Sequence, residues 1–147
     1  MSTIIREDDF IQSVADALQF ISYYHPADYI EHLGRAYERE QSPAAKDAIA
    51  QILTNSRMCA EGKRPICQDT GIVNMFLKVG MEVRWESKRS LAEMVNEGVH
   101  RAYEFPDNRL RASVVDDPAF ARKNTKDNTP AVFHVELVPG NTVEVTV

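Results

Sequence analysis

The apolar residues of this sequence change their spacing partway along the chain, and this change constrains the fold more than any other feature. Up to about residue 58 they recur every three or four positions, which is typical of helices that bury one face. From residue 132 onward they alternate with polar residues, which is typical of strands that bury one face. Helices first and strands later predict an α+β architecture.

Three helices are expected in the first half of the chain. The first follows the acidic residues 7–9, which suit a helix N-terminus. It ends at Pro26, because proline pushes its predecessor out of the helical region. The second covers residues 30–37. The third begins at Ser42 and Pro43, with the serine as N-cap and the proline in the first helical position.

The second half begins with a different pattern. Residues 71–80 form a short apolar run between two glycines, which predicts a buried strand. Ser90 and Glu93 match a capping box at the start of a fourth helix. This helix is expected to stop before Pro106, since proline cannot continue it.

The alternation near the end of the chain predicts two strands. Apolar and polar residues alternate over 132–137, a turn is expected at 139–142, and 143–147 are expected to return as the next strand. The predicted fold is therefore α+β, with N-terminal helices, a mainly antiparallel sheet and a further helix packed on that sheet.

The 147 residues are enough for one domain with a buried core, and we expect residues 1–147 to form a single domain. A net charge of −5 argues against the basic surface that nucleic-acid binding needs. No apolar run approaches the roughly 20 residues of a membrane-spanning helix, and the acidic start does not resemble a signal peptide. With only two cysteines, the sequence predicts a cytoplasmic protein without a membrane or nucleic-acid partner.

The densest group of reactive side chains lies between the third helix and the first strand. Cys67, Gln68, Asp69 and Thr70 bring a thiol, an amide, a carboxylate and a hydroxyl together on a loop. Their types alone leave several uses open. Cys67 is eight residues from Cys59, which matches no standard zinc or redox spacing, and a lone cysteine is most often a buried apolar residue. From its residue type alone, Asp69 is best explained as a turn-forming residue whose side chain bonds its own backbone near Gly71.

Residues 64–71, with the sequence RPICQDTG, closely resemble the cysteine motif of class I fumarases, the iron–sulfur-dependent fumarate hydratases. Two later stretches, 110–113 (LRAS) and 124–134 (NTKDNTPAVFH), resemble further segments of the same family in the same order and spacing. The cysteine motif is specific, whereas the later stretches are weak signals alone. The family also includes tartrate dehydratase subunits, which makes a tartrate dehydratase-type subunit the alternative.

The resemblance implies a mechanism and a set of site residues. Family members hold a [4Fe–4S] cluster with three cysteines and leave one iron open to substrate as a Lewis acid, and Cys67 matches the first ligand. The resemblance further implies a role for Asp69 in proton transfer and substrate binding, and for Gln68 in a hydrogen bond to substrate. Arg111 is the candidate for binding a substrate carboxylate through two hydrogen bonds, with Arg109 as the alternative. The implied reaction is the reversible hydration of fumarate, a small dicarboxylate, to L-malate.

Other polar residues carry weaker signals. Asn128 and Thr129 fit either a loop near the site or a turn before Pro130. Cys59 lies outside the motif and is expected to be structural. His100 shows no pattern that separates it from an ordinary structural histidine.

The chain departs from the family pattern in its cysteines, because one motif thiolate cannot hold a four-iron cluster. We therefore expect an N-terminal portion of a longer hydro-lyase or of its alpha-type subunit, inactive by itself, with the cluster only in the complete enzyme. The expected partners are the remaining part of the same enzyme or a beta subunit, and further copies in a homo-oligomer. Two hypotheses stay open beside this one: an interaction module that lost catalysis, and a thiol redox protein using Cys59 and Cys67.

Overall fold

The computed structural model describes residues 3–68 and 70–147. The chain divides into two compact units: unit 1 comprises residues 1–18 and 69–147, and unit 2 comprises residues 19–68. Helix α1 (Glu7–Tyr23) begins in unit 1 and ends in unit 2. Within the residues that the structure describes, no helix is both long and apolar enough to cross a membrane.

The predicted helices are confirmed. α1 starts with the acidic residues 7–9, and α2 (Ala27–Arg39) follows Pro26. α3 (Pro43–Gly62) has its proline in the first turn, and α4 (Leu91–Tyr103) ends before Pro106. The sequence signals that start and stop helices are local, and here they place the ends of the helices well.

The two expected N-caps differ in their hydrogen bonds. Ser90 and Glu93 form the predicted capping box, in which each side chain accepts the backbone N–H of the other residue. Ser42 occupies the N-cap position of α3, but its side chain makes no capping hydrogen bond. The carboxylate of Glu40 accepts the N–H of Ser42 instead, at 2.8 Å, and this bond organises the turn before α3.

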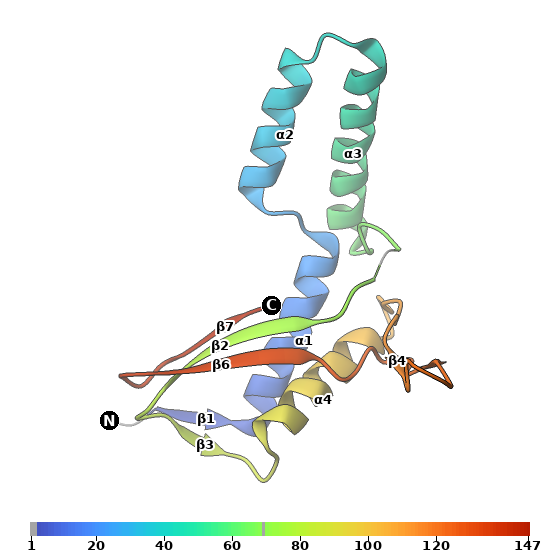
Figure 1. Cartoon of the computed structure of the whole chain (residues 1–147). Coiled ribbons are helices and arrows are strands. Elements are labelled where there is room, and N and C mark those ends of the chain that lie inside the picture. The colour runs from blue at the N-terminus through green and yellow to red at the C-terminus, as the bar shows by residue number, and fades with distance from the viewer. Residues whose placement is uncertain (1–2, 69) are drawn as a thin grey trace. The chain divides into compact units, whose positions relative to one another are not determined.

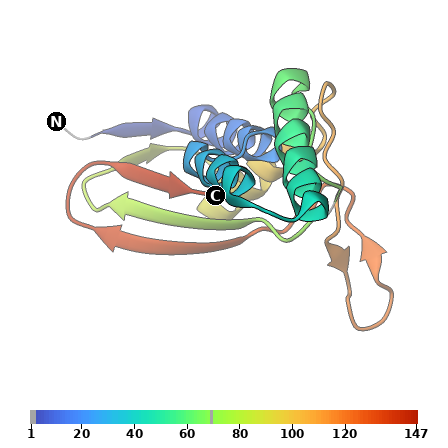
Figure 2. The ribbon, with the colours of Figure 1, turned by 90° about the horizontal axis from the view of Figure 1, so that it is seen from above.

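The main sheet of unit 1 has three strands in the order β6–β2–β7 (Figures 1 and 2). β2 (Asn74–Gly80) is the predicted buried strand, while β6 (Val132–Val138) and β7 (Val143–Thr146) are the two alternating strands. β2 pairs in parallel with β6 and antiparallel with β7. The α+β class is therefore confirmed.

The pairing within the sheet differs from the expected one, because the sheet is mixed rather than mainly antiparallel. β6 and β7 run in opposite directions, as the turn between them requires, but β2 lies between them and pairs along both of its edges. Alternation of apolar residues determines which face of a strand is buried, and carries no information on which neighbour it pairs with. Gly80 permits the close approach at the end of β2, since a Cβ there would clash with the carbonyl group of Gly140.

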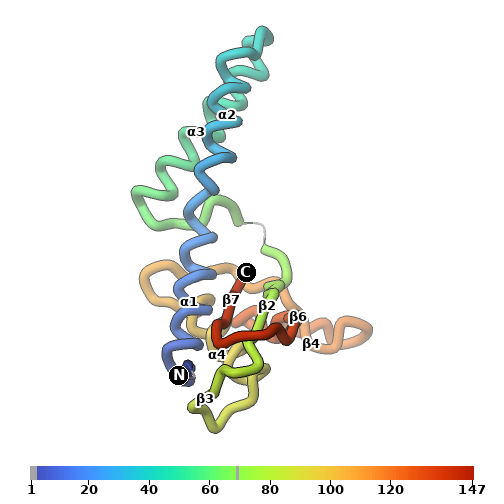
Figure 3. The backbone as a smooth tube through the Cα atoms, turned by 90° about the vertical axis from the view of Figure 1, so that its left-hand side faces the viewer, coloured from blue at the N-terminus to red at the C-terminus, as the bar shows by residue number. Residues whose placement is uncertain are grey.

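Two short strand pairs complete unit 1. β1 (Ile4–Arg6) pairs in parallel with β3 (Arg84–Glu86), and β4 (Val115–Asp116) pairs antiparallel with β5 (Lys123–Asn124). The β4–β5 hairpin extends away from the main sheet (Figures 2 and 3). Strands of two or three residues are too short to show an alternating pattern, so the sequence did not predict them.

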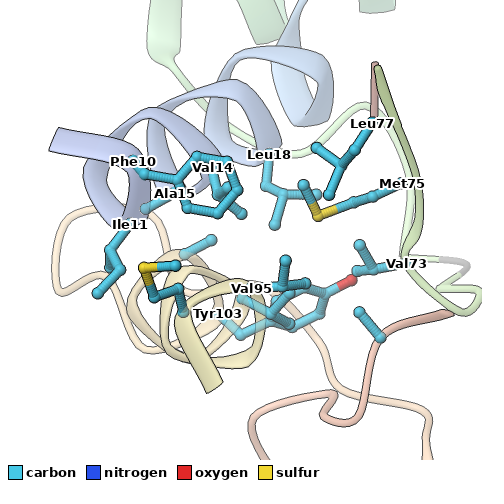
Figure 4. Packing of buried hydrophobic residues seen from close by; sticks show 14 of the residues in the cluster. Phe10, Ile11, Val14, Ala15, Leu18, Val73, Met75, Leu77, Val95 and Tyr103 are labelled. Carbon is cyan, nitrogen blue, oxygen red and sulfur yellow. The ribbon is translucent and has the colours of Figure 1, made fainter. Parts of the chain in front are cut away.

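The core of unit 1 lies between the main sheet and the helices α1 and α4 (Figure 4). Met75 and Leu77 of β2 contact a cluster that includes Val14 of α1 and Val95 and Val99 of α4, and none of the five is more than 1% exposed. Each such side chain contributes about 1.5–3 kcal/mol on burial. The helix expected to pack on the sheet is therefore confirmed, and it is α4.

The hairpin of α2 and α3 makes up most of unit 2. No residue of α2 is buried, and α3 buries only Ser56 and Cys59. The apolar residues expected as core in α2, such as Ile30 and Leu33, are only half-buried. Two packed helices offer each other a single contact face, so part of each apolar stripe stays accessible.

Candidate functional site

The segment that leads to Cys67 is held by hydrogen bonds from two helices. The Cys59 thiol, near the end of α3, donates to the carbonyl oxygen of Pro65 at 3.5 Å. Nδ2 of Asn55, also on α3, donates to the carbonyl oxygen of Ile66 at 2.9 Å. The Ile66 N–H donates to a carbonyl oxygen near the end of α1 at 2.8 Å. The backbone is thus fixed up to the residue before Cys67.

The two cysteines have different surroundings. Cys59 is buried and its thiol faces the backbone of the loop that it supports, which fits its expected structural role. Cys67 is exposed. A thiol at the exposed end of a fixed loop is accessible to a metal centre or an electrophile, whereas the redox hypothesis needs the Cys59 sulfur to leave its hydrogen bonds.

Gln68 and Asp69 follow Cys67 in the motif. Gln68 is exposed, and Asp69, the candidate for proton transfer, lies outside the described residues. Among residues 3–68 and 70–147, no three His, Cys, Asp or Glu side chains are grouped so as to hold a metal ion. A four-iron cluster takes three or four protein ligands. The described residues therefore do not fit a complete cluster, and Cys67 fits one of its ligands.

The two candidate arginines differ in their partners. Both are exposed and belong to unit 1. The guanidinium of Arg109 forms an ion pair with Glu104. Within the described part of the chain, no carboxylate forms an ion pair with Arg111. Of the two arginines, Arg109 thus already has a carboxylate partner among the described residues.

The two later family-like stretches meet in unit 1, and Asn128 joins them. Asn128 is fully buried, and its Oδ1 accepts the N–H groups of Ser113 at 2.7 Å and Val114 at 3.0 Å. Its Nδ2 donates to the carbonyl oxygen of Gly71 at 3.0 Å and to the hydroxyl oxygen of Tyr103 at 2.9 Å. Burial raises the pKa of Tyr103, and the bond from Asn128 opposes that rise. Asn128 thus lies in a loop that is hydrogen-bonded to the backbone of residues 71 and 113–114, within the family-like stretches.

A polar groove of about 470 Å³ also lies in unit 1, and the sequence did not predict it. Its lining residues are Arg89, Glu93, Asn96, Glu97, His100, Asp127 and Thr129. Nδ1 of His100 lies 3.1 Å from Oδ2 of Asp127, while Oδ1 of Asp127 accepts the N–H and hydroxyl of Thr129. Burial raises the pKa of Asp127, but the bonds from Thr129 and His100 outweigh it and hold this pKa below its ordinary value.

The lining of this groove carries more negative than positive charge, because Glu93, Glu97 and Asp127 stand against Arg89 alone. Arg89 pairs with Glu7 and Glu97, and Glu97 pairs with Arg101 as well. A lining with three carboxylates and one guanidinium disfavours the binding of a dicarboxylate. The His100–Asp127 contact joins residues 27 positions apart, so no local pattern in the sequence indicates it.

Comparison with known proteins identifies a family. Residues 11–147 match the family described as fumarate hydratase (fumerase). A Methanocaldococcus jannaschii protein named "Putative L(+)-tartrate dehydratase subunit alpha" is 32% identical over 115 residues, which cover 78% of this chain and 39% of that protein. The L(+)-tartrate dehydratase subunit alpha of Escherichia coli strain K12 is 28% identical over 128 residues, which cover 87% of this chain and 41% of the relative.

The match leaves much of these relatives without a counterpart. The chain spans about two fifths of the length of the curated relatives that it matches. The family match, by contrast, covers nearly the whole chain and includes the cysteine motif, both arginines and Asn128. The chain therefore belongs to the fumarate hydratase family.

Proposed function

We propose that this chain is part of a hydro-lyase that adds water to fumarate to give L-malate and catalyses the reverse reaction. The family match over residues 11–147 carries the proposal. The proposal concerns the whole protein that contains this chain. The matched relatives are about two and a half times as long as the part of them that aligns with this chain. A beta subunit, or a further part of the same polypeptide, is the proposed partner, because the relatives are named as alpha subunits. A cytoplasmic location remains part of the proposal, as does assembly into a homo-oligomer.

The proposal gives each motif residue a role. Cys67 is one thiolate ligand of a [4Fe–4S] cluster whose other ligands lie outside the described residues. Arg111 binds one substrate carboxylate, Gln68 forms a hydrogen bond to substrate, and Asp69 takes part in proton transfer. Removing a proton from the carbon beside a carboxylate requires a positioned base and compensation of the added negative charge, and these residue types supply both.

L(+)-Tartrate is the second candidate substrate, because the relatives carry the name of tartrate dehydratase subunits. L-Malate and L(+)-tartrate are both four-carbon dicarboxylates, and tartrate has one additional hydroxyl group. The protein that carries this chain, prepared without oxygen, should be assayed with both. The larger kcat/KM identifies the substrate. A protein that binds no cluster and turns over neither compound would favour the interaction module instead.

Replacing Cys67 with serine is expected to abolish the visible absorbance of the cluster after anaerobic reconstitution, and activity with it. The physical reason is that a serine hydroxyl is a poor substitute for a thiolate ligand to iron. The matched control is Cys59→Ser, because its hydroxyl still donates to the Pro65 carbonyl, and this variant should keep the absorbance. Full cluster absorbance in the Cys67→Ser protein would show that Cys67 is not a ligand.

Replacing Arg111 with alanine is expected to raise KM for the dicarboxylate by roughly 10- to 100-fold, since a charge-assisted hydrogen bond contributes about 1.5–3 kcal/mol. Arg109→Ala is the control. It removes the same charge but breaks only the ion pair with Glu104, so KM should stay within about twofold. Steady-state kinetics of both variants provide the measurement. The reverse ranking would assign the carboxylate to Arg109.

A further inference from the structure

Every hydrogen-bonding position of the Asn128 side chain is satisfied. It lies between β5 and β6 with a left-handed backbone (φ 62°), a conformation that asparagine adopts more readily than most residues. An asparagine amide has an oxygen with two lone pairs and a nitrogen with two hydrogens. In Asn128 both lone pairs accept backbone N–H groups and both hydrogens are donated.

The two N–H groups that Asn128 accepts belong to an irregular stretch. Residues 109–114 have neither helix nor strand, so no regular backbone pattern satisfies Ser113 and Val114. Asn128 provides an acceptor for both N–H groups in place of a partner from regular secondary structure. Arg111 lies two residues before Ser113. The position of this backbone therefore sets the point from which the Arg111 side chain extends.

The same amide group also fixes the backbone that follows the cysteine motif. Nδ2 of Asn128 donates to the carbonyl oxygen of Gly71, and Oγ of Ser113 donates to the carbonyl oxygen of Thr70 at 2.9 Å. These two bonds connect residues 70–71 with the stretch that carries Arg111. All of these residues belong to unit 1, so the connection is internal to one compact body.

We propose that Asn128 is a positioning residue for dicarboxylate binding, which holds the backbone of Arg111 in register with Thr70 and Gly71. This inference rests on the proposed function, in which Arg111 binds a substrate carboxylate. The connection needs an acceptor and a donor at the end of one short side chain. Aspartate has nearly the same volume but lacks the donor, and would place a carboxylate oxygen close to the Gly71 carbonyl oxygen, where the two repel.

The Asn128→Asp variant tests this role, with Tyr103→Phe as its matched control. The control removes the one partner of Asn128 that does not belong to the Arg111 or Gly71 backbone. Both variants are expected to lower stability. Only Asn128→Asp should raise KM for the dicarboxylate, by roughly 10- to 100-fold, with a smaller change in kcat, because a displaced binding group weakens substrate binding. A loss of folded protein alone would lower the apparent kcat and leave KM unchanged.

Amide hydrogen exchange provides a readout that is independent of activity. Aspartate keeps an acceptor for Ser113 and Val114, but repulsion from the Gly71 carbonyl oxygen should displace the carboxylate from them. These two N–H groups should therefore exchange faster in the Asn128→Asp chain than in the Tyr103→Phe chain. Unchanged exchange at these two amides, or an unchanged KM in the folded variant, overturns the positioning role. If the wild-type protein turns over no dicarboxylate, the proposed function fails, while the exchange rates still decide whether Asn128 holds this backbone.

A milder variant covers the case in which Asn128→Asp does not fold. Ser113 is exposed, and Ser113→Ala removes only its hydroxyl group, whose hydrogen the carbonyl oxygens of Thr70 and Gly71 share. KM should then rise by roughly 2- to 10-fold, as expected for the loss of one neutral hydrogen bond between the two segments. An unchanged KM in this variant would contradict the proposal.

Discussion

Replacing Leu77 with alanine is expected to lower the free energy of unfolding of unit 1 by about 2–5 kcal/mol. Leu77 is 1% exposed and lies on the face of β2 that packs against α1 and α4. Its truncation removes apolar contacts and leaves a cavity, because close-packed neighbours relax only in part. The loss is a large share of the stability of a small domain, which totals about 5–15 kcal/mol.

The neighbouring strand offers a matched control for this change. Leu137 of β6 is the same residue type in the same sheet, but it is 68% exposed, so Leu137→Ala should change stability by less than about 0.5 kcal/mol. Trp85, the single tryptophan, reports on unit 1 because it packs edge-on against Phe10, with ring centroids 5.2 Å apart. Urea denaturation followed by tryptophan fluorescence gives both values. Equal losses in the two variants would contradict the described core.

Replacing Gly98 with alanine is expected to destabilise unit 1 by about 1–3 kcal/mol, although alanine is the better helix former. Gly98 lies where α4 contacts α1, and a Cβ there would be 2.6 Å from Cβ of Val14 and 3.0 Å from the carbonyl oxygen of Ile11. One of these contacts is with backbone, which cannot move away as a flexible side chain can. The two helices would have to separate, and the contacts of Val14 and Val99 in the core would weaken.

Gly34→Ala in α2 is the control for this second prediction. A Cβ at Gly34 would have no atom within 4 Å, so helix propensity acts alone and stability of the α2–α3 hairpin should rise by up to about 1 kcal/mol. Tryptophan fluorescence follows the Gly98 variant, and helical circular dichroism follows the Gly34 variant. A gain in stability from Gly98→Ala would show that α1 and α4 do not approach each other as closely as described.

Local signals in the sequence were sufficient for the helices and insufficient for the pairing of strands. The capping box of Ser90 and Glu93 and the proline at the start of α3 act through neighbouring residues, and they appear in the structure as expected. The partner of a strand depends on segments far away in the sequence. Alternation placed the residue ranges of β6 and β7 correctly, although neither strand has a fully buried residue as a half-buried strand should. It also carried no sign that β2 lies between them. Gly98 likewise reads as a weak position in a helix until the crossing with α1 is known.

In the candidate site, too, local sequence patterns were informative and long-range contacts were not. The family resemblance predicted the site residues: the cysteine motif contains Cys67, Gln68 and Asp69, and the separate 110–113 stretch contains Arg111. Their roles remain proposals. The bond network of Asn128 connects residues 14 to 57 positions apart, and neither its burial nor its partners follow from composition or spacing. The sequence could offer only its residue type, which suits a turn and a left-handed backbone.

The strand order of the main sheet also determines when each part of the chain is able to acquire its structure. β2 is complete by Gly80, but both of its partners come after residue 131. Until those last strands exist, β2 has neither edge paired and its buried face is incomplete. The α2–α3 hairpin, whose helices follow each other directly, closes with little loop entropy. During synthesis, the hairpin is thus free to form early, whereas the core around Leu77 and Trp85 waits for the slow, long-range pairing that high contact order imposes.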